Sequence, residues 1–240
     1  MTKNLLLNQL NPTVREKVLQ RTEEVHFSFR DSLVEPNKEV ETVYFPETCV
    51  ASIVTPIDQN KLIEAATIGR DGFIGLPAFL RTKFWPETVF CQIEGTARML
   101  KTAVFEELLD AHPEFRSLCS QHTAIVLHQM ARNLACNSAH TIQQRCARWL
   151  LLSNDRVGGS QFYLTQETLA IMLGVSRTGV NIAAGGLQDA GLITYVRGKI
   201  TILNRTGLES ISCNCYRSIT DYRRQFFPDN LIVATEVSKN

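Results

Sequence analysis

Residues 165–186 read TQETLAIMLGVSRTGVNIAAGG, and this stretch predicts two short helices joined by a tight turn. Thr165 can cap the first helix, because a threonine hydroxyl accepts a hydrogen bond from a free N–H group of the first turn. Gly174 lies where the connection needs a left-handed backbone, which glycine adopts at little steric cost. Ser176 can cap the second helix, and Ala170 is small where the helices cross. These offsets are typical of a helix-turn-helix. The alternative is a helical hairpin that has this pattern by chance.

The start of the second helix carries the side chains with the chemistry to contact bases. In a helix-turn-helix this helix enters the major groove of DNA, and its N-terminal residues reach the base edges. Arg177 can bind guanine through two hydrogen bonds, Asn181 can do the same for adenine, and Thr178 can contact either base. Ser176 and the helix N-terminus suit a phosphate. For each side chain, the alternative is an ordinary solvated residue.

Residues 192–203 follow as two β-rich runs around Arg197-Gly198-Lys199, which predicts a hairpin with two basic residues at its tip. Both charges can neutralise phosphates, although a plain polar turn has the same pattern. On the first helix, two polar side chains can also meet the DNA backbone. The predicted DNA-contacting residues are Gln166, Thr168, Ser176, Arg177, Thr178, Asn181, Arg197 and Lys199.

Residues 114–138 contain no proline and no glycine, which predicts an unbroken helix about 37 Å long at 1.5 Å per residue. One face carries an apolar seam at coiled-coil spacing, and a second apolar set lies beside it. We expect this helix to pair with a second copy of the chain. The alternative is a core helix of a monomer. The predicted dimerisation residues are Leu118, Ile125, Leu127, Ala131 and Leu134.

The N-terminal part has a different texture. A short helix begins at Asn11-Pro12, since asparagine caps well and proline suits the first helical position. Short apolar or alternating segments with turn signals between them then predict an antiparallel barrel or sandwich. These segments are residues 25–29, 40–45, 50–54, 62–68, 89–93 and 97–100. The chain is therefore expected to be α+β.

The composition excludes several classes of protein. The 240 residues are 44% hydrophobic and 20% charged, with a net charge of +1. The longest apolar run, residues 169–173, has five residues, whereas a membrane span needs about 20 and a signal-peptide core about 7 to 15. We therefore expect a cytoplasmic protein without a membrane span. Residues 141–227 hold ten basic and five acidic side chains, a weak indication of contact with nucleic acid on that side.

The seven cysteines are scattered along the chain and include no C-x-x-C pair. A disulfide framework, a zinc site or an iron–sulfur site is not expected from this spacing, and no metal ligand or other cofactor is predicted. Most of the cysteines are expected to be small buried hydrophobic residues. No nucleophile elbow, phosphate-binding glycine loop or H-E-x-x-H motif is present, so an enzyme is not expected.

Three stretches make the chain similar to the Crp/Fnr superfamily of bacterial transcription regulators. They are residues 164–203, the segment QMARNL at 129–134, and the glycine-bearing region 43–75. The resemblance implies an N-terminal β-roll sensor of jelly-roll type in residues 1–113, a dimerisation helix at 114–138 and a winged helix-turn-helix at 139–216, with a C-terminal tail at 217–240. It also implies a homodimer on palindromic double-stranded DNA, with RNA polymerase as a candidate further partner.

The sequence departs from the family pattern at the effector site. In cyclic-nucleotide binders of the family, an acidic residue follows the last glycine of the loop, and an Arg-Ser pair some residues later holds the phosphate. Here Gly75 is followed by Leu76-Pro77, and residues 85–89 contain no Arg-Ser pair, so cyclic AMP is not expected to bind by the usual cassette. The first cysteine is Cys49, so the N-terminal iron–sulfur motif of other members is missing. In the recognition helix, Thr178 replaces a glutamate of the best-known member.

The effector therefore stays unidentified. Haem binding through a histidine and redox sensing through a cysteine remain open. A second reading of the whole chain is a ligand or redox sensor that acts through protein partners while its helix-turn-helix is idle. The candidate haem ligands are His112, His122, His128 and His140, and the candidate redox residues are Cys91, Cys119 and Cys136.

Overall fold

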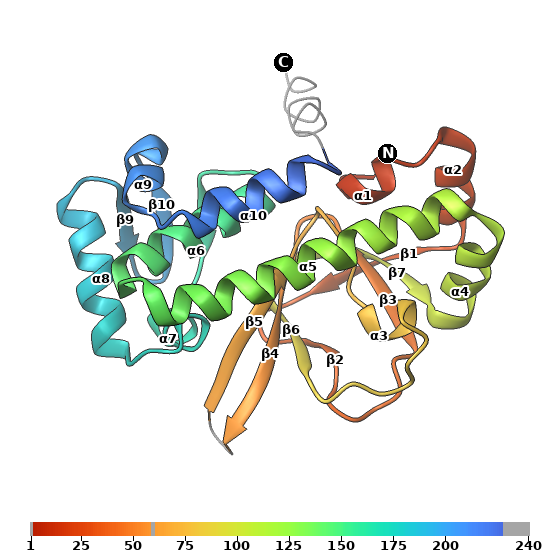
Figure 1. The fold of residues 1–240 in the computed structure, drawn as a ribbon, viewed down its shortest axis with the longest axis horizontal. Helices are drawn as coiled ribbons and strands as arrows, with labels where there is room; N and C mark the ends of the chain where they lie inside the picture. The colour runs from red at the N-terminus through yellow and green to blue at the C-terminus, as the bar shows by residue number, and fades with distance from the viewer. Residues whose placement is uncertain (1, 59–60, 228–240) are drawn as a thin grey trace.

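The structure is a computed structural model that describes residues 2–58 and 61–227. Figure 1 shows a β-rich half and a helical half, with the long helix α5 (Pro113–Ala139) running across both. The expected α+β architecture is confirmed, and α5 exceeds the predicted helix by one residue at each end.

The β-rich half consists of two antiparallel sheets. One has the strand order β1-β7-β3 and the other the order β2-β6-β4-β5. Each segment predicted from the sequence forms a strand, and the three-residue strand β2, which is too short to show alternation, is additional. The strands are β1 (Glu23–Phe27), β2 (Ser32–Val34), β3 (Thr42–Pro46), β4 (Val50–Asp58), β5 (Lys61–Ile68), β6 (Thr88–Ile93) and β7 (Gly95–Lys101).

Four short helices accompany these sheets. They are α1 (Leu5–Asn8), α2 (Pro12–Gln20), α3 (Leu76–Phe79) and α4 (Thr102–Ala111). Helix α2 begins as predicted, because the side chain of Asn11 accepts a hydrogen bond from the N–H of Val14 and Pro12 occupies the first position.

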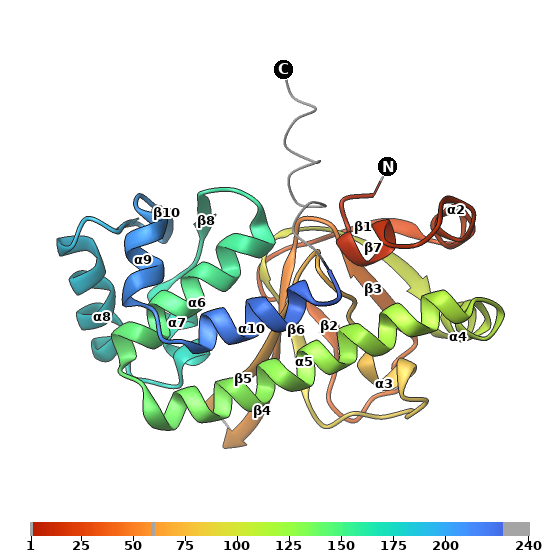
Figure 2. The same ribbon diagram turned by 45° about the horizontal axis from the view of Figure 1, so that its top comes forward.

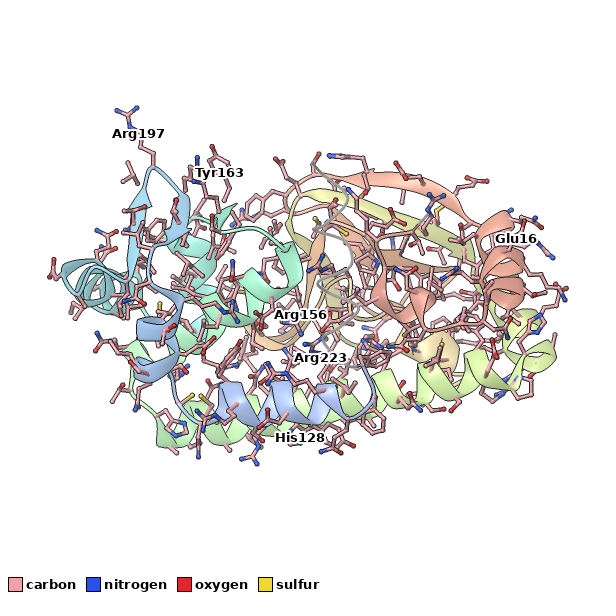
Figure 3. All side chains as sticks on the ribbon, turned by 90° about the horizontal axis from the view of Figure 1, so that it is seen from above. Glu16, His128, Arg156, Tyr163, Arg197 and Arg223 are labelled. Carbon is pink, nitrogen blue, oxygen red and sulfur yellow. The ribbon has the colours of Figure 1, made fainter. Side chains whose placement is uncertain are left out.

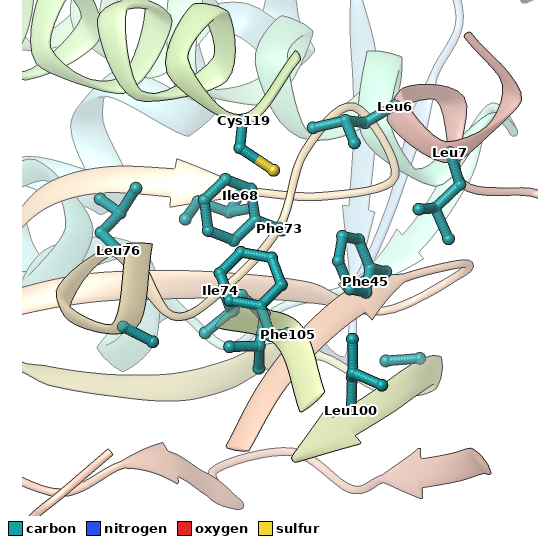
Figure 4. Packing of buried hydrophobic residues seen from close by; sticks show 14 of the residues in the cluster. Leu6, Leu7, Phe45, Ile68, Phe73, Ile74, Leu76, Leu100, Phe105 and Cys119 are labelled. Atoms are coloured by element: carbon teal, nitrogen blue, oxygen red, sulfur yellow. The ribbon is translucent and has the colours of Figure 1, made fainter. Parts of the chain in front are cut away.

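The core of the β-rich half is aromatic (Figure 4). The ring of Phe45 lies 6.1 Å from that of Phe73 and 6.0 Å from that of Phe115, which belongs to α5. Phe105 from α4 joins the same cluster. Helix α5 therefore contributes one of its faces to this core, so its position is fixed by burial of apolar surface.

The helical half holds α6 to α10 and a small sheet with the order β8-β10-β9. Strand β8 was not predicted, because three residues give no periodic signal. The elements are α6 (Ile142–Val157), β8 (Gln161–Tyr163), α7 (Gln166–Leu173), α8 (Arg177–Asp189), β9 (Ile193–Val196), β10 (Lys199–Ile202), α9 (Arg205–Ile211) and α10 (Cys215–Arg224).

The last described helix folds back onto the body of the molecule. Helix α10 lies beside α5 in both ribbon views (Figures 1 and 2). Phe227, which follows it, is 1% exposed in the core of the β-rich half. The expected boundary between residues 216 and 217 thus falls inside a packed helix. The rest of the expected tail, residues 228–240, lies outside the described residues.

The two halves also pack directly against each other. Val50, Val54 and Ile93 of the sheets join one apolar cluster with Trp149 and Leu150 of α6. This contact makes the helical half part of a continuous body rather than a domain on a free linker. Within residues 2–58 and 61–227, no helix combines the length and hydropathy required to cross a bilayer.

Candidate nucleic-acid interface

The predicted helix-turn-helix is formed by α7 and α8. The hydroxyl of Thr165 accepts a hydrogen bond from the N–H of Thr168 at 3.1 Å, and the hydroxyl of Ser176 accepts one from the N–H of Gly179 at 3.2 Å. Gly174 has φ 61°, the left-handed conformation that its position requires. The two caps and the turn glycine therefore match the prediction.

Burial sets the orientation of α8. Val180 and Leu187 are completely buried and Ala183 is 4% exposed, so these three residues form the inner face of the helix. The N-terminal residues of the opposite face, Arg177 and Thr178, are exposed. Because α8 is held by its apolar face, its polar face is free to meet a partner.

The predicted base-contacting side chains share this open face. Arg177, Thr178 and Asn181 are all exposed. The guanidinium of Arg177 donates through Nε to Oε1 of Gln166 at 3.5 Å, a contact between α8 and the start of α7. Gln166 therefore lies beside Arg177, as a residue that orients it would.

Thr168 is the residue in the predicted set that the structure removes from the surface. Thr168 is only 1% exposed, and its hydroxyl forms a 2.8 Å hydrogen bond with the hydroxyl of Thr165. The sequence predicts that Thr168, like Gln166, meets the DNA backbone, because both lie on the first helix of the motif. In the structure the Thr168 side chain contacts Thr165, the N-cap residue of α7. Thr168 therefore stabilises the start of this helix.

The predicted hairpin is formed by β9 and β10. Arg197 and Gly198 have φ values of 49° and 81°, typical of a two-residue turn whose twist suits a hairpin. Figure 3 shows Arg197 extending away from the body at the tip. Lys199 is instead the first residue of β10, paired with Val196 and Tyr163, and it is half-buried. The tip therefore carries one arginine rather than two basic residues.

The basic excess of this half of the chain is not all on the surface. Arg145, Arg148, Arg156 and Arg223 are each no more than 9% exposed. These arginines hold the interior together, so the counted excess overstates the charge available to an anionic partner.

The outer face of α5 bears an apolar stripe that is exposed among residues 2–58 and 61–227. Leu127 is 61% exposed and Leu134 is 73% exposed, with exposed Ala131 between them. Leu118 is half-buried against the core. Ile125, the fifth predicted dimerisation residue, is 5% exposed and packs inside its own protomer, because it lies on the face of α5 that turns toward the sheets.

The interior of the β-rich half is filled around His122. The imidazole lies 4.9 Å from the ring of Phe73, and a Cβ atom at Gly72 would stand 1.8 Å from Nε2. Burial, supported by the charge of Arg156, lowers the pKa of His122 to about 4 against the opposing effect of Asp71. His122 is thus a neutral, packed side chain of the core.

The redox candidates Cys91 and Cys119 are both buried. Burial raises the pKa of the Cys91 thiol to about 12 and that of the Cys119 thiol well above its usual range. A thiol must ionise to act as a nucleophile or to be oxidised readily, so these two residues behave as small hydrophobic side chains.

A group that sequence reasoning missed lies at the other end of α5. Cys136, His140, Cys213 and Cys215 place one ligand atom each within 4.8 Å of one another. The expectation of no metal site rests on spacing along the chain, whereas the fold brings these four side chains together from distant positions. The available signals were the four-residue spacing of Cys136 and His140 on one helix and the close pair Cys213 and Cys215.

Comparisons with known proteins agree with this geometry. Residues 144–211 match the Crp-like helix-turn-helix domain. FixK2 from Bradyrhizobium japonicum superposes with a TM-score of 0.69 at 16% identity, covering 80% of this chain and 98% of FixK2. The c-di-GMP responsive regulator CLP from Xanthomonas campestris gives a TM-score of 0.62 at 16% identity, covering 80% and 99%. A CooA variant from Carboxydothermus hydrogenoformans gives 0.62 at 15% identity, covering 89% and 96%.

No curated sequence matches the chain. The solved relatives share its fold from the β-rich half to the winged helix at low identity, and the domain match covers the segment that carries the capped helices and the hairpin. Residues 144–211 thus match a Crp-like helix-turn-helix domain, and the fold around that domain is similar to those of FixK2 and a candidate Crp/Fnr-family regulator from Eubacterium rectale.

Proposed function

We propose that the chain acts as a homodimer that binds palindromic promoter DNA in a sequence-specific manner, under the control of an effector sensed by the β-rich half. The observation that carries this proposal is the exposed N-terminal face of α8 with Arg177, Thr178 and Asn181. These three side chains have the donors and acceptors to distinguish bases in the major groove.

Neighbouring residues contact the phosphates of the DNA or position Arg177. The exposed N-terminus of α8 at Ser176 presents free N–H groups to a phosphate. Gln166 orients Arg177, and Arg197 at the hairpin tip reaches the DNA backbone. Lys199 adds positive charge behind the tip.

A second copy of the chain, related by a two-fold axis, matches the symmetry of palindromic DNA. Leu127, Ala131 and Leu134 form a stripe at coiled-coil spacing on the open face of α5, and pairing two such stripes removes their apolar surface from water. The two copies of α8 would then enter successive major grooves about 34 Å apart, one turn of the duplex.

A genome-wide footprint followed by binding assays on the recovered sites tests this function. The wild-type chain should protect palindromic sites, and its affinity should fall steeply as salt concentration rises. Arg177→Ala should weaken binding to those sites by about 1–3 kcal/mol and relax the preference at one base pair of each half-site.

Lys17→Ala is the matched control, since it also removes one exposed positive charge but lies in α2, at the opposite end of the molecule from α8 (Figure 1). Binding that is equal in Arg177→Ala, Lys17→Ala and wild type, on specific and random DNA alike, contradicts the proposed interface. Such a result would favour a sensor that acts through protein partners.

A further inference from the structure

The four-residue cluster of Cys136, His140, Cys213 and Cys215 lies where three helices converge. Cys136 is in the last turn of α5, and His140 caps that helix. Cys213 lies between α9 and α10, and Cys215 is the first residue of α10. The C-terminal end of α5, where the chain enters the helical half, thus lies next to the connection between α9 and α10.

The spacing of the cluster suits one tetrahedral ion. The sulfurs of Cys136 and Cys213 are 3.4 Å apart, and Nδ1 of His140 lies 3.8 Å from the sulfur of Cys215. In a tetrahedral zinc site with metal–sulfur bonds of about 2.3 Å, sulfur atoms stand about 3.8 Å apart. All four ligand atoms lie within 4.8 Å of one another, so small side-chain movements bring them to that geometry.

Two buried arginines, Arg145 and Arg148, lie near the cluster. Arg148 and Arg145 are 3% and 7% exposed, and the Nε atom of each has no hydrogen-bond partner. In the part of the chain that the structure describes, neither arginine forms an ion pair with a carboxylate. Two buried positive charges therefore stand beside three sulfurs.

We propose that Cys136, His140, Cys213 and Cys215 bind one Zn²⁺ ion. Three thiolates and a neutral imidazole around Zn²⁺ carry a net charge of −1, which the two buried arginines compensate. The Cys₃His set with every position filled by protein is a structural rather than a catalytic zinc site. The ion links the end of α5 to the start of α10 and so fixes the angle at which the helix-turn-helix half leaves the long helix.

The same geometry disfavours the other uses of such a cluster. An iron–sulfur cluster places several irons and inorganic sulfides between its cysteines, which needs wider spacing than this group has. A disulfide between Cys136 and Cys213 would not account for the positions of His140 and Cys215, whose ligand atoms lie within 4.8 Å of the same two sulfurs. Three thiolates with one imidazole select zinc among the common metals.

Metal analysis of the full chain is the first test. The untagged protein, purified under reducing conditions without chelator, should contain one zinc ion per chain by mass spectrometry. Exchange with Co²⁺ should produce the intense thiolate-to-cobalt charge-transfer bands and visible bands of a tetrahedral site. Zinc-free protein that takes up no metal from a buffered zinc solution overturns the proposal, as does an intact mass that shows the loss of two hydrogens in a Cys136–Cys213 disulfide.

Matched variants assign the ligands. Cys213→Ser should abolish zinc binding, and His140→Asn should lower zinc affinity by more than the roughly 10–100-fold typical of losing an outer-shell contact. The controls are Cys146→Ala, a buried cysteine in the core of the same half, and His112→Asn at the opposite end of α5. Equal zinc content in ligand and control variants contradicts the assignment.

A rescue variant separates binding from folding. His140 is only half-buried, so its replacement should leave the fold intact. His140→Cys should retain one zinc ion as a Cys₄ site and shift the cobalt spectrum, and a chelator should lower the Tm of wild type but not of Cys213→Ser. If His140→Cys binds zinc no better than His140→Asn, His140 is not a ligand. These measurements use no DNA, so they stand or fall independently of the proposed function.

Discussion

Arg156 and Asp71 form a buried ion pair that joins the two halves of the molecule. Nε of Arg156 lies 3.3 Å from Oδ1 of Asp71, and the two side chains are 6% and 13% exposed. The same guanidinium donates to Oγ1 of Thr67 at 2.6 Å and to Oε1 of Gln129 at 3.1 Å. One arginine of α6 thus holds the end of β5, the loop that follows it, and α5, near the centre of Figure 3.

Replacing Asp71 by asparagine should destabilise the protein strongly, because it leaves the buried charge of Arg156 without its partner. The expected loss in the free energy of unfolding is about 3–5 kcal/mol, measured by urea denaturation. Asp110→Asn is the control, since its ion pair with Arg81 is exposed and should matter little. Equal unfolding midpoints for the two variants would show that the ion pair does not join the halves.

Asp71 should also make stability depend on pH in acid. Burial by itself would raise the pKa of Asp71, but the charges of Arg156 and Arg223 outweigh it and lower the pKa to about 2 from 3.8. The unfolded chain takes up the proton first, so the contribution is complete above pH 3.8 and is lost as pH falls toward 2. The unfolding free energy of wild type should drop across this range more steeply than that of Asp71→Asn.

The raised pKa of Glu64 predicts that stability depends on pH in the opposite direction near neutral pH. Burial raises its pKa to about 7 from 4.5, although hydrogen bonds from Ser52 and Trp149, both 2.9 Å long, favour the ionised form. The folded chain therefore holds a proton that the unfolded chain has lost, and stability falls as pH rises from 4.5 through 7. In Glu64→Gln, this fall in Tm should disappear. Parallel Tm curves for the two proteins would show that Glu64 is ionised in the fold.

The open stripe of α5 predicts the assembly state. Leu127→Glu combined with Leu134→Glu places like charges at the seam and should convert a dimer to a monomer in sedimentation experiments. Leu80→Glu is the control, because Leu80 is 58% exposed on the β-rich half, close to the exposure of Leu127. A wild-type monomer, or a dimer that survives both substitutions, would exclude this helix as the interface.

Gly185 in α8 has room for a methyl group. A Cβ atom there would meet nothing within 4 Å, and glycine in a helix interior costs up to about 1 kcal/mol relative to alanine. Gly185→Ala should therefore raise the free energy of unfolding by about 0.5–1 kcal/mol. Gly174→Ala should lower it, because φ 61° strains any residue with a Cβ. Changes of the same sign in both variants would contradict this account.

The sequence predicted the parts of the site whose chemistry is local. Thr165, Gly174 and Ser176 fix the turn between α7 and α8 through contacts within a few residues, so their roles were evident from spacing alone. The open stripe of α5 follows the helical period in the same way. The local sequence does not distinguish the two adjacent glycines of α8: a Cβ atom at Gly186 would stand 3.0 Å from Nε2 of Gln143, whereas one at Gly185 would meet nothing within 4 Å.

The features that the sequence did not predict depend on distant segments. Cys136 and Cys213 are 77 positions apart, and only the return of α10 along α5 brings them together. Ile125 and Leu127 both suit an apolar seam, and which of them turns inward is decided by the sheets that pack on α5. The burial of Thr168 is not evident from its position near the start of the helix, because it depends on how α7 packs in the fold.

The burial of Trp149 against the sheets gives the molecule an intrinsic optical reporter. The chain has two tryptophans, and Trp149, 2% exposed, has its indole N–H bonded to Glu64 across the boundary between the halves. Any ligand that separates the helical half from the β-rich half would bring this indole into water and shift its fluorescence emission to the red. Ligands can therefore be screened on the unlabelled protein before any promoter is known.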